Sequence, residues 1–177
     1  MDLDRKESLA TTSREKFSTF KSLSQTLGPE RAWEKMLEGF PEQQKLQMSP
    51  FLSLPTLAEG FTRAIPFFNG AGMDMQVVDI SNRGRDSVLE IQKLCPYLDV
   101  CKESGFATPC HVICEMHVEG IRRAFPEMTG EILSRQAFGA SVCLFKYERA
   151  AAGAPPALPA PNPSPSSGPP RFPVARA

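Results

Sequence analysis

Apolar residues recur at helical spacing through the first 68 residues of the chain. The steps of three or four residues that place side chains on one helix face are clearest at Phe17, Phe20, Leu23 and Leu27. An amphipathic helix is predicted over about 12–26. A second helix is predicted to start at Pro29, which fits a first helical position, and to close at Pro41. A third is predicted over 55–68, with Pro66 at its end.

The apolar pattern changes to that of β-strands from about residue 73. Residues 73–80 and 87–94 flank the loop SNRGRD, whose Asn and Gly are typical of a hairpin turn. Residues 130–137 and 141–148 read as a second strand pair. Four such strands predict an antiparallel sheet.

Two further helices are predicted between the strand pairs. A short one begins near Pro96, and a longer one runs over about 109–125 until Pro126 stops it. The predicted fold class is therefore α+β: N-terminal helices packed with a small antiparallel sheet of about four strands and a helix that bears Cys and His.

Proline content separates a body from a tail. Nine of the 17 prolines lie within residues 150–177, which offer few large apolar side chains. Their burial would not offset the backbone ordering cost of roughly 1–2 kcal/mol per residue. We expect residues 1–149 to form a single α+β domain and residues 150–177 to form a disordered tail rich in Pro, Ala and Ser.

Charge and hydropathy narrow the range of partners. The chain has 20 basic and 20 acidic residues and no basic stripe, which argues against binding to nucleic acid or to an anionic membrane surface. No stretch has the roughly 20 apolar residues of a membrane span, and the first residues are too charged for a signal peptide. We expect a cytoplasmic protein whose partner is a small-molecule substrate.

All five cysteines and both histidines lie in the window from Cys95 to Cys143. Steps of four, three and four along a helix over 109–125 place on one face Cys110, Cys114, His117 and Ile121. Two thiols and one imidazole are therefore expected to converge.

A metal site is one interpretation of this convergence. Cys110, Cys114 and His117 would supply three donors, and Cys95 a fourth, with Cys101 or Cys143 as alternatives. Zinc, iron or an iron–sulfur cluster would suit such donors, although no cysteine spacing here is the two-residue zinc knuckle. Packing in the core is the competing interpretation for each cysteine.

A catalytic site is another interpretation. Cys114 and His117, three residues apart on a helix, form a nucleophile and base pair, and Cys110 at the positive end of the helix is favoured as a thiolate. Arg122 and Arg123 are candidates for holding a substrate carboxylate, with a solvated helix face as the alternative.

Several motifs together resemble the L-2-amino-thiazoline-4-carboxylic acid hydrolase-like family. They are CPYLDVCKESGF, CHVICEMHVEGIRRAFP, and a closing strand with Gly139 and Cys143-x-Phe145, within about residues 15–148. The resemblance implies an N-terminal helical part, a hairpin that leads into a Cys-Pro motif, a Cys-containing helix and a Cys-x-Phe strand. Its type activity would be the opening of a thiazoline ring by water, with cleavage of a C–N or C–S bond.

The resemblance marks Cys95, Cys114 and Cys143 as family-like, whereas an acidic residue is usual at the position of His117. The first hypothesis is an enzyme that acts on a small sulfur- or nitrogen-containing carboxylic acid, as in a tailoring step of bacterial secondary metabolism. Cys114, His117 and Cys110 would be catalytic, and Cys95 and Cys143 would lie near the substrate, whose carboxylate the arginines would hold. The alternatives are a metal-, iron–sulfur- or haem-binding accessory or sensor protein, and a scaffold whose cysteines only pack.

Overall fold

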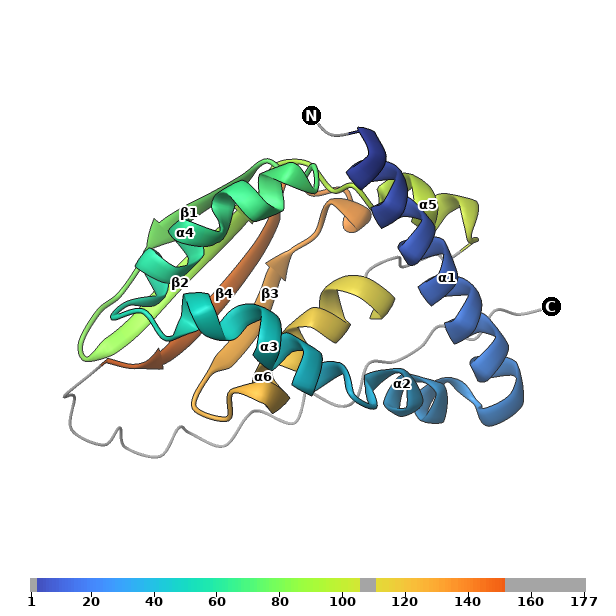
Figure 1. Ribbon diagram of the computed structural model, residues 1–177, viewed down its shortest axis with the longest axis horizontal. Helices are drawn as coiled ribbons and strands as arrows, with labels where there is room; N and C mark the ends of the chain where they lie inside the picture. The colour runs from blue at the N-terminus through green and yellow to red at the C-terminus, as the bar shows by residue number, and fades with distance from the viewer. Residues whose placement is uncertain (1–2, 106–110, 152–177) are drawn as a thin grey trace.

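The computed structural model describes residues 3–105 and 111–151, and they form an α+β fold (Figure 1). Its elements in chain order are α1 (Leu3–Leu27), α2 (Pro29–Leu37), α3 (Phe40–Leu52), α4 (Leu57–Gly70), β1 (Met75–Asp79), β2 (Arg85–Gln92), α5 (Leu98–Glu103), a π-helical turn (His111–Glu115), α6 (Met116–Ala124), β3 (Thr129–Ser134), a 3₁₀ turn (Gln136–Phe138) and β4 (Cys143–Ala150).

The four strands form one antiparallel sheet in the order β1-β2-β4-β3. The predicted antiparallel sheet is thus confirmed. Its first hairpin turns at Arg83 and Gly84, both with positive φ (49° and 78°), which is the backbone of a tight hairpin turn. Asn82 and Arg85 close this turn by exchanging backbone hydrogen bonds of 3.0 and 2.9 Å.

The N-terminal half is helical, as predicted, but its boundaries differ from the prediction. The sequence around Pro41 was expected to close a helix, yet Pro41 lies in the first turn of α3, where a missing N–H breaks no helical hydrogen bond. Pro66 was expected to end the third helix, whereas it lies inside α4, which continues to Gly70. A proline therefore marks a helix start at one place and a helix interior at the other.

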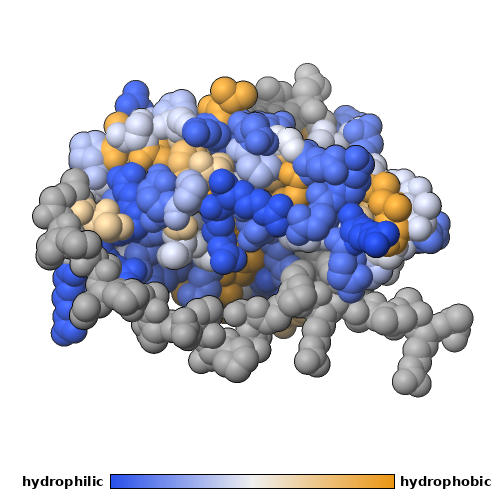
Figure 2. All heavy atoms as spheres, turned by 90° about the horizontal axis from the view of Figure 1, so that it is seen from below, coloured by the Kyte–Doolittle hydropathy of each residue, from blue (hydrophilic) through white to orange (hydrophobic). Residues whose placement is uncertain are grey.

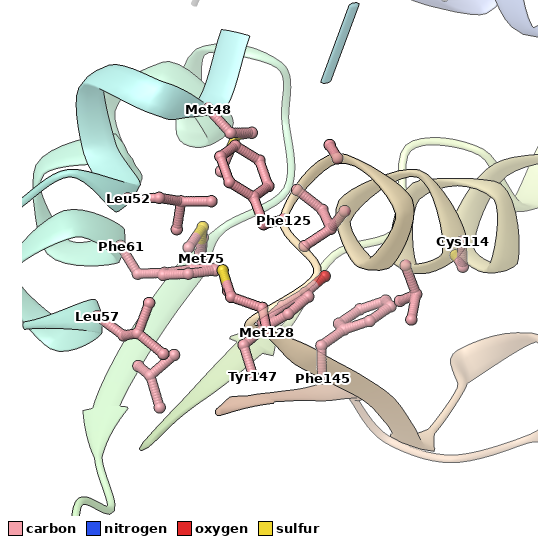
Figure 3. Packing of buried hydrophobic residues seen from close by; sticks show 14 of the residues in the cluster. Met48, Leu52, Leu57, Phe61, Met75, Cys114, Phe125, Met128, Phe145 and Tyr147 are labelled. Carbon is pink, nitrogen blue, oxygen red and sulfur yellow. The ribbon is translucent and has the colours of Figure 1, made fainter. Parts of the chain in front are cut away.

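Buried side chains form two clusters. One lies between the sheet and helices α3, α4 and α6, and Figure 3 shows part of it, with Phe145 and Tyr147 reaching from β4 toward the helices. The other joins α1 and α2 to α5 and to the π-helical turn, around Phe17, Trp33 and Cys101. The helices thus connect two cores, and the cavity described below is lined by residues of both.

Two glycines allow close helix packing. A Cβ added to Gly60 of α4 would lie 2.3 Å from the backbone oxygen of Phe51, and one added to Gly120 of α6 would lie 2.8 Å from the ring of Phe40. Both Phe51 and Phe40 belong to α3. Helix α3 therefore approaches each neighbour at a position that only glycine fits.

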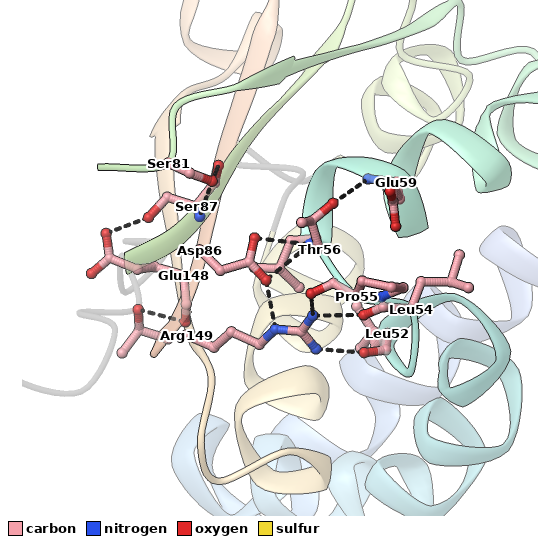
Figure 4. Close-up of polar contacts among 12 residues, drawn as sticks. Leu52, Leu54, Pro55, Thr56, Glu59, Ser81, Asp86, Ser87, Glu148 and Arg149 are labelled. Carbon is pink, nitrogen blue, oxygen red and sulfur yellow. Dashed lines mark hydrogen bonds and ion pairs between the residues drawn. The ribbon is translucent and has the colours of Figure 1, made fainter. Parts of the chain in front are cut away.

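A charged pair fixes the connection between α3 and α4 to the sheet (Figure 4). Asp86 of β2 accepts hydrogen bonds of 2.9 and 3.0 Å from the backbone N–H of Leu57, the first residue of α4. Arg149 of β4 donates to Asp86 at 2.7 Å and to the carbonyl oxygens of Leu52 and Leu54. The polar groups of this buried junction are thereby satisfied.

The surface view in Figure 2 is mostly hydrophilic, with apolar residues in small separate groups. Within residues 3–105 and 111–151, no helix has the length and apolar character that crossing a membrane requires.

Candidate active site

A small cavity lies between the sheet and helices α3, α4 and α6. Its volume is about 50 Å³, a third of the roughly 150 Å³ of an apolar protein cavity that holds benzene. Methionine and phenylalanine side chains form much of its wall, including Met48, Phe61 and Phe145. The polar and titratable groups on this wall are Gln44, Glu90, Gln92, Tyr97, Cys114, His117 and Tyr147. An apolar cavity with a few convergent polar groups is typical of a small-molecule site.

Cys114 and His117 both contribute to the cavity wall, as does Ile121 one turn later. These three residues were predicted to share one helix face. Cys114 is 7% exposed, and the His117 ring lies against Phe40 with 5.5 Å between ring centroids. Cys110, the fourth residue predicted on this face, lies outside the described residues.

The helix that carries this pair is not regular. Residues 111–115 form a π-helical turn and α6 starts only at Met116, whereas an α-helix was predicted from about residue 109. A π turn contains an extra residue and is frequent at functional sites. Cys114 lies within this turn and His117 follows it.

Burial keeps the His117 imidazole neutral. Loss of solvation, together with the positive charge of Lys16, lowers the pKa of His117 to about 4. Lys16 of α1 is half-buried, and its Nζ lies 5.1 Å from the centroid of the Phe40 ring that also contacts His117. At neutral pH, His117 therefore has a ring nitrogen able to accept a proton.

Glu90 is a functional candidate that the sequence analysis missed. It lies on β2 and is 4% exposed. Burial raises the pKa of Glu90 to about 7, and a hydrogen bond from Gln92 lowers this pKa by a smaller amount. The negative charge of Cys143 adds to the increase. A carboxyl group with this pKa transfers protons readily near neutral pH. The available signal was its inward position in the strand, between the buried Val88 and Gln92.

Two tyrosines add hydroxyl groups to the wall. Tyr97 follows β2 and Tyr147 lies on β4, and both are nearly fully buried. Burial raises the pKa of each tyrosine, and the negative charges of Glu90 and Cys114 raise it further. Both hydroxyls therefore stay protonated and are able to donate hydrogen bonds.

Arg122 and Arg123 are not on the cavity wall. Arg123 forms a bidentate pair with Glu34 of α2 at 2.9 Å and a bond of 2.8 Å with Glu119. Arg122 lies 3.4 Å from the same Glu119. These guanidinium groups are solvent-facing and already paired with carboxylates of the protein, so their geometry offers no support for the expected role in holding a substrate carboxylate.

Cys95 and Cys143 contact each other away from the cavity wall. Cys95 lines a separate open hollow on the surface, and Cys143 is 1% exposed behind it. The pair therefore lies outside the cavity that Cys114 and His117 line.

The predicted metal site is not assembled by the described part of the chain. Among those residues, no group of three or more His, Cys, Asp and Glu side chains is arranged to hold a metal ion. Cys114 and His117 line the cavity, Cys95 pairs with Cys143, and Cys110 is not described. The donors expected to surround one ion are thus divided between two places.

Comparison with solved structures identifies a shared fold. The phenol-responsive sensory domain of the transcription activator PoxR, solved with phenol, matches with a TM-score of 0.51 and 13% sequence identity, over 84% of this chain and 76% of that chain. No curated protein matches the sequence. The family model of L-2-amino-thiazoline-4-carboxylic acid hydrolase matches residues 7–147, which include every element from α2 to β3 and the cavity between them. The chain therefore belongs to the L-2-amino-thiazoline-4-carboxylic acid hydrolase family.

Proposed function

We propose that the protein is a hydrolase that cleaves a C–N or C–S bond of a small sulfur- or nitrogen-containing carboxylic acid bound in the cavity. One observation carries the proposal: Cys114, His117 and Glu90 share the wall of one cavity that is otherwise largely apolar. A thiol, a neutral imidazole and a carboxyl group of near-neutral pKa are the groups that nucleophilic and acid–base hydrolysis requires. Membership of the family supports the reaction class.

The three groups take different roles in this mechanism. His117, with its pKa near 4, is unprotonated at pH 7 and accepts the proton of the Cys114 thiol or of a water molecule. The resulting nucleophile adds to the ring carbon between nitrogen and sulfur. Glu90, with a pKa near 7, delivers a proton to the nitrogen or sulfur that leaves when the ring opens. Where the Cys114 sulfur is the nucleophile, a water molecule that gives its proton to the Glu90 carboxylate then adds to the same carbon, and the Cys114 sulfur leaves and takes back its proton from His117. Exclusion of bulk water by the apolar wall strengthens these interactions.

The cavity limits the size of the substrate. A five-membered ring needs more room than about 50 Å³, and the unbranched side chains of Met48 and Met73 on the wall can supply it by changing rotamer. Larger substrates would have to displace the aromatic residues Phe61 and Phe145, which are nearly fully buried.

Charge favours one side of the cavity for the acid group. Arg122 and Arg123 are paired with glutamates, whereas Lys16 is half-buried near His117, and burial lowers its pKa. A substrate carboxylate beside Lys16 would restore the stability of the ammonium form. Lys16 does not line the cavity wall, but its charge acts on His117, which does, so we assign the acid group to this side as a long-range attraction and not as a direct contact.

Turnover of 2-amino-thiazoline-4-carboxylate by the purified protein tests the proposal. Cys114→Ala and His117→Gln should each lower kcat by about a hundredfold or more. Cys101→Ala is the matched control, since Cys101 is also a buried thiol but belongs to the core around α1 and α2. Turnover that survives in both active-site variants would overturn the assignment of this pair.

A second candidate is ligand binding without turnover. It is favoured by the protonated hydroxyls of Tyr97 and Tyr147 on an apolar wall, and by the fold shared with a phenol-responsive sensory domain. Calorimetry with phenol discriminates the two functions. Saturable binding of phenol without turnover of any thiazoline, lost in Tyr97→Phe, would support the sensor over the enzyme.

A further inference from the structure

The thiol groups of Cys95 and Cys143 form a hydrogen-bonded pair outside the cavity. Cys143 is the first residue of β4 and pairs in register with Gln92, near the end of β2, while Cys95 follows three residues after Gln92. The Cys95 thiol donates its hydrogen to the Cys143 sulfur. The two sulfurs are therefore neighbours, which is the first requirement for disulfide chemistry.

Three donors or charges surround the Cys143 sulfur. The Cys95 thiol is the strongest, the backbone N–H of Gln136 donates to Sγ at 3.3 Å, and the guanidinium of Arg135 is close enough to act on its charge. Together they outweigh burial and lower the pKa of Cys143 to about 6. The sulfur is thus held as a thiolate at neutral pH although it is nearly inaccessible.

Only one thiol of the pair meets solvent directly. Cys95 is half-buried and lines an open hollow together with Leu94, Pro96, Arg14 and Gln136. Arg14 in this hollow is paired with Glu103 at 3.1 Å, so its charge is largely neutralised. Asp99 adds a negative charge to the same hollow, so a small neutral or cationic reagent is favoured and reaches Cys95 first.

We propose that Cys95 and Cys143 are a reactive dithiol that undergoes exchange with a low-molecular-weight disulfide. The Cys143 thiolate takes the proton of Cys95, and the Cys95 sulfur attacks the disulfide R–S–S–R. A mixed disulfide between Cys95 and R–S forms, and one R–S⁻ leaves and takes the proton from Cys143. The Cys143 thiolate then attacks the Cys95 sulfur, the second R–S⁻ leaves, and solvent protonates it. The protein loses two electrons and one proton, solvent supplies the second proton, and the reagent becomes two thiols.

Neither sulfur lies on the cavity wall, so the exchange is a separate reaction from the proposed hydrolysis. The charge of the Cys143 thiolate does reach Glu90, and its loss on disulfide formation would lower the pKa of that carboxyl group. The other described cysteines lack the same arrangement toward solvent. Cys101 is 2% exposed in the core around α1, and Cys114 is 7% exposed on the cavity wall. The order of events is set by access: Cys95 reacts with the reagent, and Cys143 resolves the intermediate.

Bis(2-hydroxyethyl) disulfide, a neutral reagent, tests the proposal on the full chain. Intact mass and peptide mapping should show the wild type losing two hydrogens as the peptides of Cys95 and Cys143 become joined. In Cys143→Ser the reaction should stop at the mixed disulfide on Cys95, and in Cys95→Ser the Cys143 peptide should stay unmodified. Cys101→Ser is the matched control and should behave as the wild type.

The pH profile separates a reactive pair from an ordinary surface thiol. With the pKa of Cys143 at about 6, the wild-type exchange rate should rise about tenfold from pH 5 to pH 7 and then level off. An ordinary thiol, with a pKa of about 8.5, continues to gain rate above pH 8, and we expect that behaviour in Cys143→Ser or, if that variant does not fold, in Cys143→Ala. A wild-type protein that stops at an adduct, or that joins Cys95 to a cysteine other than Cys143, would overturn the proposal.

Discussion

Glu90 and Gln92 point to the same face of β2, and the side-chain amide of Gln92 donates a hydrogen bond to the carboxyl group of Glu90. This contact partly offsets the loss of solvation that raises the pKa of Glu90 to about 7. A buried carboxyl group with a pKa of about 7 is close to the midpoint of its titration at neutral pH, where proton uptake and release cost least.

Glu90→Gln should stabilise the protein at high pH. In the folded state the pKa of Glu90 is about 7, above its ordinary value of 4.5, so folded protein keeps a proton that unfolded protein loses as pH rises. Stability contributed by this proton is full below pH 4.5 and is lost by pH 7, a change on the order of 3 kcal/mol. Urea unfolding should show the variant more stable than wild type at pH 8, with little difference at pH 4.5. Equal differences at both pH values would contradict the raised pKa, and Glu131→Gln on the exposed side of β3 is the control.

Acid should destabilise the protein through His117. The folded-state pKa of His117 is about 4, below its ordinary value of 6.5. Unfolded protein therefore binds a proton that folded protein rejects, and stability is lost as pH falls from 6.5 toward 4. His117→Gln should lose part of this acid sensitivity in urea unfolding at pH 6.5 and pH 4.5. In NMR titration, Lys16→Gln should raise the pKa of His117, and an unchanged midpoint would exclude Lys16 as a cause.

Alanine at Gly120 should loosen the contact between α3 and α6. The added Cβ would lie 2.8 Å from the Phe40 ring, which must shift away and which also contacts His117. We expect a loss of roughly 1–3 kcal/mol in unfolding free energy, together with a change in the His117 environment. Gly105→Ala has no atom within 4 Å of the new Cβ, but its φ of +70° adds strain of its own, so Arg122→Ala, at an exposed position of α6, is the better comparison.

Removal of Arg149 should cost more stability than removal of Arg85. Arg149 forms an ion pair with the buried Asp86 and donates hydrogen bonds to three backbone carbonyl oxygens. Arg149→Ala therefore leaves a buried carboxylate without its cation. We expect a loss of about 3–5 kcal/mol. Arg85→Ala breaks a pair with Glu148 in which the arginine is 45% exposed, and such pairs contribute about 1 kcal/mol or less. Thermal unfolding of both variants makes the comparison, and similar losses would argue against the junction at Asp86 as a major support.

Turnover should survive the loss of both helix arginines. Arg122→Ala and Arg123→Ala remove side chains that pair with Glu119 and Glu34 outside the cavity. We expect KM and kcat to change by less than about threefold, with a stability loss within about 1 kcal/mol. Lys16→Gln, by contrast, should raise KM for an acidic substrate. A large increase of KM in Arg122→Ala or Arg123→Ala would return these residues to the binding site.

The sequence predicts the sheet well because its signals are local. Strand alternation and the Gly84 turn define the first hairpin without reference to the rest of the chain. Helix α3 was missed because Pro41 is compatible both with the end of one helix and with the first turn of the next. The contacts of α3 with α4 and α6 decide between the two possibilities, and a pattern of neighbouring residues cannot predict these contacts.

The candidate site could be predicted only in part. Cys114, His117 and Ile121 share a helix face, and their spacing alone brings them to one wall. Glu90 was missed because apolar and polar residues occur on both faces of β2. Leu89 and Ile91 are apolar residues on the face opposite Glu90, so the sequence pattern did not show which face is buried. Arg123 was expected to bind a substrate carboxylate, but it pairs with Glu34 on α2. This partner is 89 residues away in the sequence, so no local pattern could predict the pair.

The position of β4 in the chain determines when the cavity can exist during synthesis. This last strand lies between β2 and β3 in the sheet and supplies Phe145 and Tyr147 to the wall. It also carries Arg149, which fixes the connection between α3 and α4. A nascent chain that ends before β4 therefore has every helix of the site but no closed cavity, and a ligand of the cavity would bind only after the final strand has left the ribosome.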